Sequence, residues 1–135
     1  MARRFVVKER FREGDIRELR ANGNSAFRNL PVVILVNGGS ASASEILAGA
    51  LRDQRGAKLI GTKTFGKGTV QEIENLKDGS TLKVSIAEWL TPNGGIINKK
   101  GLEPDIEIKI SDEDIENKKD PQFEKALEVI KSEIK

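Results

Sequence analysis

Residues 32–71, with the sequence VVILVNGGSASASEILAGALRDQRGAKLIGTKTFGKGTVQ, decide the fold of this chain. The β-branched and aliphatic run at 32–36 predicts a buried strand, and the Asn-Gly-Gly sequence at 37–39 ends it. A second apolar run at 57–60 predicts another strand, which leads into a glycine-rich loop containing Lys67. Because open α/β sheets place chemistry beyond their strand ends, the polar residues after both strands are candidates for a functional site.

Between these two strands the sequence predicts a helix over residues 43–55. Ser42 and Glu45 match the Ser-x-x-Glu pattern of a capping box, in which Ser42 is the N-cap and Glu45 reaches back to its amide. Gly56 is the expected residue just after the helix. The predicted apolar face is formed by Ile46, Leu47, Ala50 and Leu51, with Ala43 and Ala48 filling tight places.

The flanking regions supply further strands and one more helix. Two short strands at 5–10 and 16–21 enclose turn-like residues, so a hairpin is expected there. Strands are also predicted at 70–74, at 81–90 with one buried face, at 96–98 and at 106–110. Residues 111–120 are expected to be a charged, solvated linker. Residues 121–135 are expected to form an amphipathic helix, whose apolar face comprises Phe123, Ala126, Leu127, Ile130 and Ile134.

Composition narrows the chemistry that the chain can perform. Its 135 residues include 23 Lys plus Arg, 21 Asp plus Glu, and neither cysteine nor histidine. The near balance of charge gives no reason to expect a nucleic-acid partner. The missing Cys and His exclude thiol nucleophiles, the usual zinc sites and a Ser-His-Asp triad. Any nucleophile must therefore be Ser, Thr, Lys or a carboxylate, and no metal or other cofactor is expected.

Ser42 admits two interpretations, which are compatible with each other. The commoner one is a helix N-cap. The functional one is a nucleophile, because the amide of Ala43 and the positive end of the helix dipole would stabilise an oxyanion at this place. Small neighbours, including Gly38 and Gly39, leave room for a substrate backbone to approach.

Lys67 is either a solvated loop lysine or a general base. An ordinary lysine has a pKa of about 10.4, so a base needs an apolar surrounding that favours the neutral amine. Phe65 and Val70 are the neighbours that would supply it. A third interpretation is phosphate binding, since residues 61–67 fit the first seven positions of G-x-x-x-x-G-K-[ST]. However, Gly68 stands where a hydroxyl should be, and a β-rich sequence follows instead of a helix start.

Two segments carry a resemblance to a known family. Residues 37–51 (NGGSASASEILAGAL) and 61–71 (GTKTFGKGTVQ) resemble the core of the carboxyl-terminal processing proteases, or tail-specific proteases. These are serine peptidases that use a Ser-Lys dyad. Residues 90–94 (LTPNG) and 101–105 (GLEPD) fit the family as well, and the similarity runs from about residue 5 to about residue 110. The resemblance implies an α/β fold like that of ClpP and crotonase, a mixed sheet with flanking helices.

The resemblance also implies roles for particular residues. Ser42 is the nucleophile, Lys67 is its general base and Gln71 supports the lysine. The Ala43 amide is one oxyanion donor. The implied substrates are proteins or peptides with free C-termini, cleaved near those ends. The implied location is outside the cytoplasm, in the periplasm or cell envelope, although residues 1–11 do not have the apolar core of a signal peptide.

Two parts of the family pattern do not occur in this sequence. One is the PDZ domain that binds the substrate's C-terminus, and the other is an upstream turn that supplies a second oxyanion donor. We therefore expect residues 1–110 to be the C-terminal part of a peptidase core, with little activity alone. An uncovered sheet edge and the C-terminal helix predict a homo-oligomer. The alternative function is a non-catalytic scaffold, in which Ser42 is only a cap.

Overall fold

Seven strands and three helices make up the described part of the chain, residues 5–23 and 26–134 of this computed structural model. The predicted α/β class with flanking helices is confirmed. Parallel and antiparallel pairings are both present, divided between two sheets. The antiparallel sheet has the order β2-β1-β6-β5, and the parallel sheet has the order β3-β4-β7.

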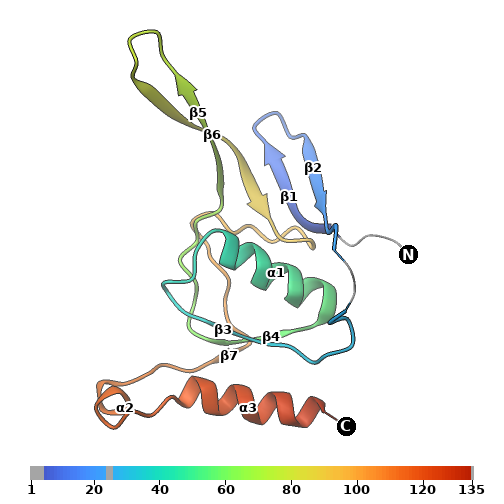
Figure 1. Cartoon of the computed structure of the whole chain (residues 1–135), viewed down its shortest axis with the longest axis vertical. Coiled ribbons are helices and arrows are strands. Elements are labelled where there is room, and N and C mark those ends of the chain that lie inside the picture. The colour runs from blue at the N-terminus through green and yellow to red at the C-terminus, as the bar shows by residue number, and fades with distance from the viewer. Residues whose placement is uncertain (1–4, 24–25, 135) are drawn as a thin grey trace.

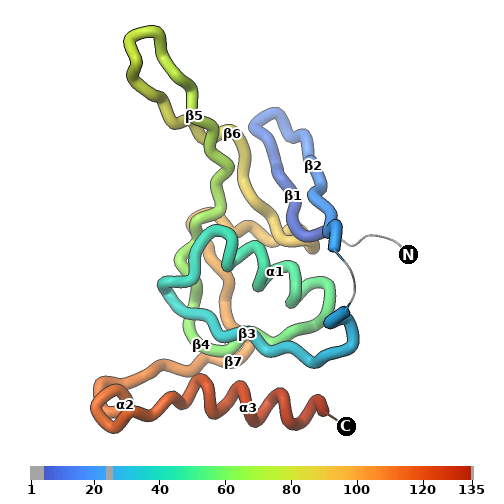
Figure 2. Tube along the Cα trace, in the orientation of Figure 1, coloured from blue at the N-terminus to red at the C-terminus, as the bar shows by residue number. Residues whose placement is uncertain are grey.

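The antiparallel sheet consists of two hairpins joined through β1 and β6. The first hairpin pairs β1 (Phe5–Phe11) with β2 (Ile16–Arg20), as the sequence predicted. The second pairs β5 (Thr69–Asn75) with β6 (Thr81–Leu90), and its tip extends away from the helices (Figures 1 and 2). Residues 87 and 88 of β6 pair with β1 on one side and with β5 on the other, whereas residues 81–85 pair with β5 alone.

The prediction of one continuous buried face on β6 is wrong for its first half. Leu82 and Val84 are 51% and 38% exposed, whereas Ala87 and Leu90 are buried. The first half belongs to the projecting tip of the hairpin, where no second layer covers either face (Figure 1). Alternation of apolar and polar residues marks the side-chain directions of a strand, but it does not supply the layer that buries one of them.

The parallel sheet joins β3 (Val33–Val36), β4 (Lys58–Gly61) and the two-residue strand β7 (Ile106–Glu107). Helix α1 (Ala43–Arg55) connects β3 to β4 and lies between the two sheets, touching β1 on one side and β4 on the other (Figure 1). Helix α3 (Pro121–Glu133) packs on β3 and β4 from the opposite face of the parallel sheet. The layers therefore run sheet, helix, sheet, helix.

Three predicted strands differ from the observed ones. The strand predicted at 32–36 is only partly buried, with Leu35 42% exposed, because β3 lies at the edge of the parallel sheet. The strand predicted at 106–110 is reduced to Ile106–Glu107. The return strand predicted at 96–98 is a single bridge, in which Ile96 pairs with Leu90. Each of these segments is short, and neighbouring elements decide how much of it pairs.

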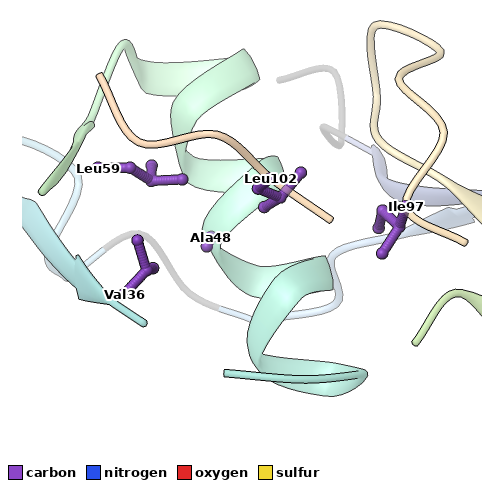
Figure 3. Close-up of a cluster of buried hydrophobic side chains, with 5 residues drawn as sticks. All are labelled: Val36, Ala48, Leu59, Ile97 and Leu102. Atoms are coloured by element: carbon purple, nitrogen blue, oxygen red, sulfur yellow. The ribbon is translucent and has the colours of Figure 1, made fainter. Parts of the chain in front are cut away.

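The core is a small cluster of buried apolar residues that links α1 to both sides of the molecule (Figure 3). Its members are Val36, Ala48, Leu59, Ile97 and Leu102. Helix α1 enters this core through its small residues, since Ala48, Gly49 and Ala50 are buried. The predicted burial of Leu47 is wrong, because this side chain is 58% exposed. Small residues allow α1 to lie close to its neighbours, and a Cβ on Gly49 would come within 2.8 Å of the Thr91 side chain.

The C-terminal region differs from its prediction in two ways. The charged segment 111–120 is largely exposed as expected, but it contains a short helix, α2 (Asp112–Glu116), capped reciprocally by Ser111 and Asp114. Helix α3 begins after Asp120 as predicted, yet its packed face is shifted. Phe123 and Leu127 are exposed, whereas Gln122 is buried and donates to the Ile108 carbonyl at 2.7 Å. None of the helices in the described part of the chain is long and apolar enough to cross a membrane.

Candidate active site

A tight turn after β3 delivers Ser42 to the start of α1. The Ser40 amide donates to the Asn37 carbonyl at 2.9 Å, and the Asn37 side chain accepts from the Gly39 amide at 2.9 Å. The Asn37 amide donates to the Ser40 hydroxyl at 3.1 Å. Asparagine favours such turns because its side chain bonds the backbone two residues on. The chain therefore leaves the sheet at Asn37 and reverses before the helix begins.

Ser42 is the N-cap of α1, as predicted, but it does not have the backbone of an ordinary cap. Its φ is 56° and its ψ is −115°, whereas N-cap residues are usually extended. Such a conformation costs a residue other than glycine on the order of 1–3 kcal/mol, and residues of this kind cluster at active sites. The capping role alone therefore does not account for the conformation of Ser42.

Glu45 is the centre of the site, although its side chain is 0% exposed. Its Oε2 atom accepts from the amides of Ser42 and Lys67, each at 2.9 Å. Its Oε1 atom accepts from the Gly66 amide at 2.8 Å and from the Thr64 hydroxyl. A buried carboxylate is costly unless it is fully hydrogen-bonded, and these four donors satisfy it. The carboxylate therefore fixes the start of α1 against the 62–68 loop.

Thr64 extends this network to a third segment of the chain. Its hydroxyl accepts from the Leu102 amide at 2.7 Å, and its amide donates to the Leu102 carbonyl at 3.1 Å. The backbones approach so closely here that a Cβ on Gly101 would lie 2.4 Å from the Thr64 carbonyl oxygen. Gly101 also has a φ of 66°, which glycine adopts without strain. The GLEPD and TFGKG segments thus pack together through main-chain contacts.

The backbone of Lys67 is held beside that of Ser42, because both amides bind the same Glu45 oxygen. The Lys67 side chain is exposed. Among the described residues, no hydrogen bond joins the Ser42 hydroxyl to the Lys67 ammonium group. Catalytic hydrogen bonds in free enzymes are often long and tighten only with substrate bound. The Ser42–Lys67 dyad therefore stays a prediction.

Gln71 lies near the start of β5, four residues beyond Lys67. Its Nε2 atom donates to the Ser85 hydroxyl at 3.5 Å, across the β5–β6 hairpin. The pairing of these strands shifts register between Val70 and Gln71, which alters the direction in which the following side chains point. The structure does not join Gln71 to Lys67, so the predicted support of the lysine also stays a prediction.

The Ala43 amide lies at the N-terminus of α1. It belongs to the first turn of α1, where backbone N–H groups have no partner within the helix. The neighbouring amides are occupied, since that of Ser42 binds Glu45 and that of Ser44 binds the Ala41 carbonyl at 3.2 Å. Within residues 5–23 and 26–134, the Ala43 amide has no acceptor. It is available to a ligand at the helix N-terminus.

The phosphate-binding interpretation of residues 61–67 is not supported by the geometry of this loop. After Gly61 the chain crosses an irregular loop and continues into β5, so no helix N-terminus faces it. The amides of Gly66 and Lys67, which would cradle a phosphate, already donate to Glu45. A carboxylate occupies the place that an anion would need.

An open pocket between β1 and β6 is the other concave place near the site. Its lining includes Arg10, Glu88 and Asn98, and the Glu88 carboxylate accepts hydrogen bonds from the other two. Arg10 donates to Glu88 at 2.7 Å and Asn98 donates to it at 3.0 Å. These hydrogen bonds, that of Arg10 foremost, hold the pKa of Glu88 below its ordinary value. The pocket therefore contains a charge pair that joins two strands and needs no ligand to satisfy it.

The sequence did not predict the central position of Glu45. Its capping box correctly predicted the bond to the Ser42 amide, one of the four bonds that Glu45 accepts. The other three come from residues 19 to 22 positions further along the chain. The only available signal was a glutamate in the first turn of a helix whose neighbours are small and apolar.

Comparisons with known proteins agree on one group. The family model described as Peptidase family S41 matches residues 1–108. A protein described as a "probable CtpA-like serine protease" of Staphylococcus haemolyticus is 46% identical over 115 residues, which are 80% of this chain and 23% of that protein. A carboxyl-terminal-processing protease of Synechocystis is 43% identical over 122 residues, which are 88% of this chain and 28% of that protein. The chain thus spans about a quarter of the length of these relatives.

A solved structure is similar in both fold and sequence. It is the photosystem II D1 C-terminal processing protease, with a TM-score of 0.74 and 44% identity. The similarity covers 81% of this chain and 28% of that protein. The arrangement of the two sheets around α1 is therefore shared with a peptidase of known structure.

Proposed function

The chain belongs to peptidase family S41, and we propose that it carries the nucleophile and the general base of a serine peptidase of the carboxyl-terminal processing type. Ser42 is the nucleophile, Lys67 is the general base and the Ala43 amide is one oxyanion donor. Gln71 supports Lys67 once the site is occupied. The substrates are polypeptides, cleaved near their free C-termini at a place outside the cytoplasm.

One observation carries this proposal: a single buried oxygen, Oε2 of Glu45, binds the amides of both Ser42 and Lys67. A helix cap needs no connection to a loop lysine. A catalytic dyad does, because the two side chains must start from backbones with a fixed separation. The positive φ of Ser42 also supports a nucleophile at this position, because nucleophilic serines are found on sharp turns at the start of a helix.

The proposed reaction proceeds through an acyl-enzyme. The neutral amine of Lys67 takes the proton of the Ser42 hydroxyl while Oγ attacks the scissile carbonyl carbon. The carbonyl oxygen becomes an oxyanion, which the Ala43 amide and the N-terminus of α1 stabilise. The lysine ammonium then protonates the leaving amine, the C–N bond breaks, and water hydrolyses the ester by the same route in reverse.

We propose that this chain alone acylates at Ser42 but turns over slowly. The oxyanion hole of such enzymes uses more than one donor, and loss of one donor costs on the order of a hundredfold or more in rate. The chain spans about a quarter of its relatives, which leaves their other parts to supply the remaining groups. Covalent labelling is therefore a better test than turnover.

The test is reaction with a fluorophosphonate, followed by intact mass and peptide mapping between pH 6 and pH 10. We expect one adduct at Ser42, formed faster as the pH rises. Ser42→Ala should abolish it. Lys67→Arg, which keeps the positive charge but cannot act as a base, should slow it at least tenfold. Ser44→Ala, which changes an exposed serine on the same turn, should react as the unaltered chain does.

Three results would overturn the proposal. Labelling at another residue would mean that Ser42 is only a cap. Equal labelling rates in Lys67→Arg and the unaltered chain would remove Lys67 from the reaction. If Ser42 does not react at any pH, the scaffold interpretation replaces the enzymatic one.

A further inference from the structure

The outer edge of β5 is the feature that the proposed function leaves unused. β5 is the last strand of the order β2-β1-β6-β5, so in the described part of the chain only one of its edges is paired. We propose that an extended segment of the protein substrate pairs with this edge as an added strand, which leads its backbone to Ser42. The inference rests on the proposed function, because it names how that site takes its substrate.

The edge has the properties that strand addition requires. It is seven residues long, contains no proline, and is exposed from Gln71 to Asn75. The hairpin projects from the rest of the molecule, which leaves space beside β5 (Figures 1 and 2). In a paired antiparallel strand, alternate residues direct N–H and C=O groups away from the partner, and an incoming chain can bind them. The register shift of β5 lies at its lower end, between Val70 and Gln71, and the pairing is regular from Gln71 to Asn75.

The lower end of this edge is tied rigidly to the candidate dyad. Thr69, the first residue of β5, follows Lys67 by two residues, a distance of at most about 7 Å along the chain. The Lys67 amide is fixed on Glu45, and the Gly68 carbonyl accepts from the Trp89 amide at 2.7 Å. Gly68 lies so close to the next segment that a Cβ there would come within 2.3 Å of the Asn98 amide nitrogen. A chain paired to β5 therefore leaves its edge beside the start of α1.

Side chains on the hairpin predict what such a segment contains. Glu72 lies opposite Val84 and Glu74 opposite Leu82, so both carboxylates share one face of the hairpin. Ile73, which is 63% exposed, lies on the other face. A strand added to β5 continues both faces. We therefore expect it to alternate basic side chains beside the glutamates with apolar ones beside Ile73.

The first experiment measures binding of a defined peptide. Fluorescein-labelled Lys-Val-Lys-Val-Lys-Val is titrated with the Ser42→Ala variant of the whole chain, and fluorescence anisotropy gives the dissociation constant. The same peptide with N-methyl groups on alternate residues, which removes its main-chain donors, should bind at least tenfold more weakly. A Glu-Val peptide of the same length should bind about three- to tenfold more weakly, the effect of two exposed charge pairs.

The second experiment reverses the charge of the edge. Glu72→Lys together with Glu74→Lys changes two exposed side chains, so the fold should be retained. This variant should prefer the Glu-Val peptide. Glu13→Lys together with Glu18→Lys makes the same change on the other hairpin and should leave the preference for Lys-Val unaltered.

The outcomes separate this inference from the proposed function. Absence of peptide binding, or binding that ignores both N-methylation and charge reversal, would overturn the inference even if Ser42 reacts with the fluorophosphonate. Edge-dependent binding in a chain whose Ser42 never reacts would retain the strand addition and reject the peptidase. Sedimentation could instead show a dimer that dissociates when Glu72 and Glu74 are both changed to Lys. The β5 edge would then bind a second copy of this chain, which would also overturn the inference.

Discussion

Ser42 combines a helix-capping position with a backbone that suits glycine better than serine. Its φ is positive, at 56°, as it is at only two other non-glycine positions among the described residues, Lys99 and Lys118, both in turns. Strain of this kind persists where surrounding contacts fix it, and here the Ser42 amide is bound to buried Glu45. The strain therefore belongs to the proposed site and can be measured.

We predict that Ser42→Gly is more stable than Ser42→Ala by about 1–2 kcal/mol, because glycine adopts this φ freely and is a tolerable N-cap. Both variants lack the Ser42 hydroxyl, so any difference between their stabilities comes from the backbone and not from loss of that hydroxyl. Urea denaturation of both proteins gives the difference in free energy of unfolding. Equal stabilities would show that the backbone of Ser42 is unstrained in solution.

Replacing Glu45 by Gln should destabilise the chain by about 2–4 kcal/mol, because the new NH₂ group would face amides that need an acceptor. The same change should slow fluorophosphonate labelling of Ser42, since the serine and lysine backbones would lose their common anchor. Glu116→Gln, at an exposed position in α2, is the matched control and should change neither quantity. If folded Glu45→Gln is labelled at an unaltered rate, Glu45 does not position Ser42 and Lys67 for the reaction.

At the scale of elements, glycines allow three segments of the chain to meet around the 62–68 loop. Gly61, Gly66, Gly68 and Gly101 each lie where a Cβ would come within 3.0 Å of another segment's backbone. The resulting contacts join three segments, namely the end of β3, residues 61–68 and the turn at 98–101. Main-chain packing of this kind holds the loop against its neighbours without regular secondary structure.

Gly68→Ala should cost about 1–3 kcal/mol, because its Cβ would lie 2.3 Å from the Asn98 amide nitrogen and the backbone must move. Gly23→Ala is the matched control, since nothing lies within 4 Å of its Cβ, and should change the stability by less than about 0.5 kcal/mol. Thermal unfolding monitored by circular dichroism compares them. A neutral Gly68→Ala would mean that the loop and the 98–102 turn separate readily.

The charge pair between β1 and β6 predicts a pH dependence. Hydrogen bonds from Arg10 and Asn98 lower the pKa of Glu88, so its contribution to stability is complete above the ordinary glutamate pKa of about 4.3. It is lost as the pH falls through the lowered value. Because the pair is partly exposed, Glu88→Gln should cost at most about 1 kcal/mol at pH 7. This difference should shrink below pH 4, and a difference that grows there would contradict the assigned cause.

At the scale of the whole molecule, the core is small for the surface that surrounds it. Large apolar side chains remain exposed on most elements, and Phe123 and Leu127 of α3 are exposed together with Ile134 at its C-cap. Exposed apolar stripes of this kind usually meet a partner. The exposed face of α3 is therefore a surface through which the predicted homo-oligomer can form, and it is separate from the β5 edge.

We predict that sedimentation velocity shows self-association that increases with concentration. Phe123→Gln together with Leu127→Gln should reduce it, because both side chains are exposed on the same face of α3. Glu124→Gln together with Glu128→Gln, also on exposed positions of α3, should leave it unaltered. A monomer at every concentration would show that α3 does not mediate association.

The sequence by itself determined the local elements. Its capping box, terminal glycine and apolar spacing defined α1 from Ala43 to Arg55, and turn residues separated the strands of both hairpins. These signals act within a few residues, so a linear sequence contains them completely. The paired motifs around Ser42 and Lys67 also identified the family that the comparisons show.

Only the tertiary structure decided which faces are buried and where the site's centre lies. Leu47 and Leu82 follow apolar patterns but lack a covering layer, whereas Glu45 is charged but fully buried. Burial depends on segments distant in sequence, and four donors from two segments make a buried carboxylate tolerable. Periodicity specifies the direction of a side chain, and the surrounding fold specifies what that side chain meets.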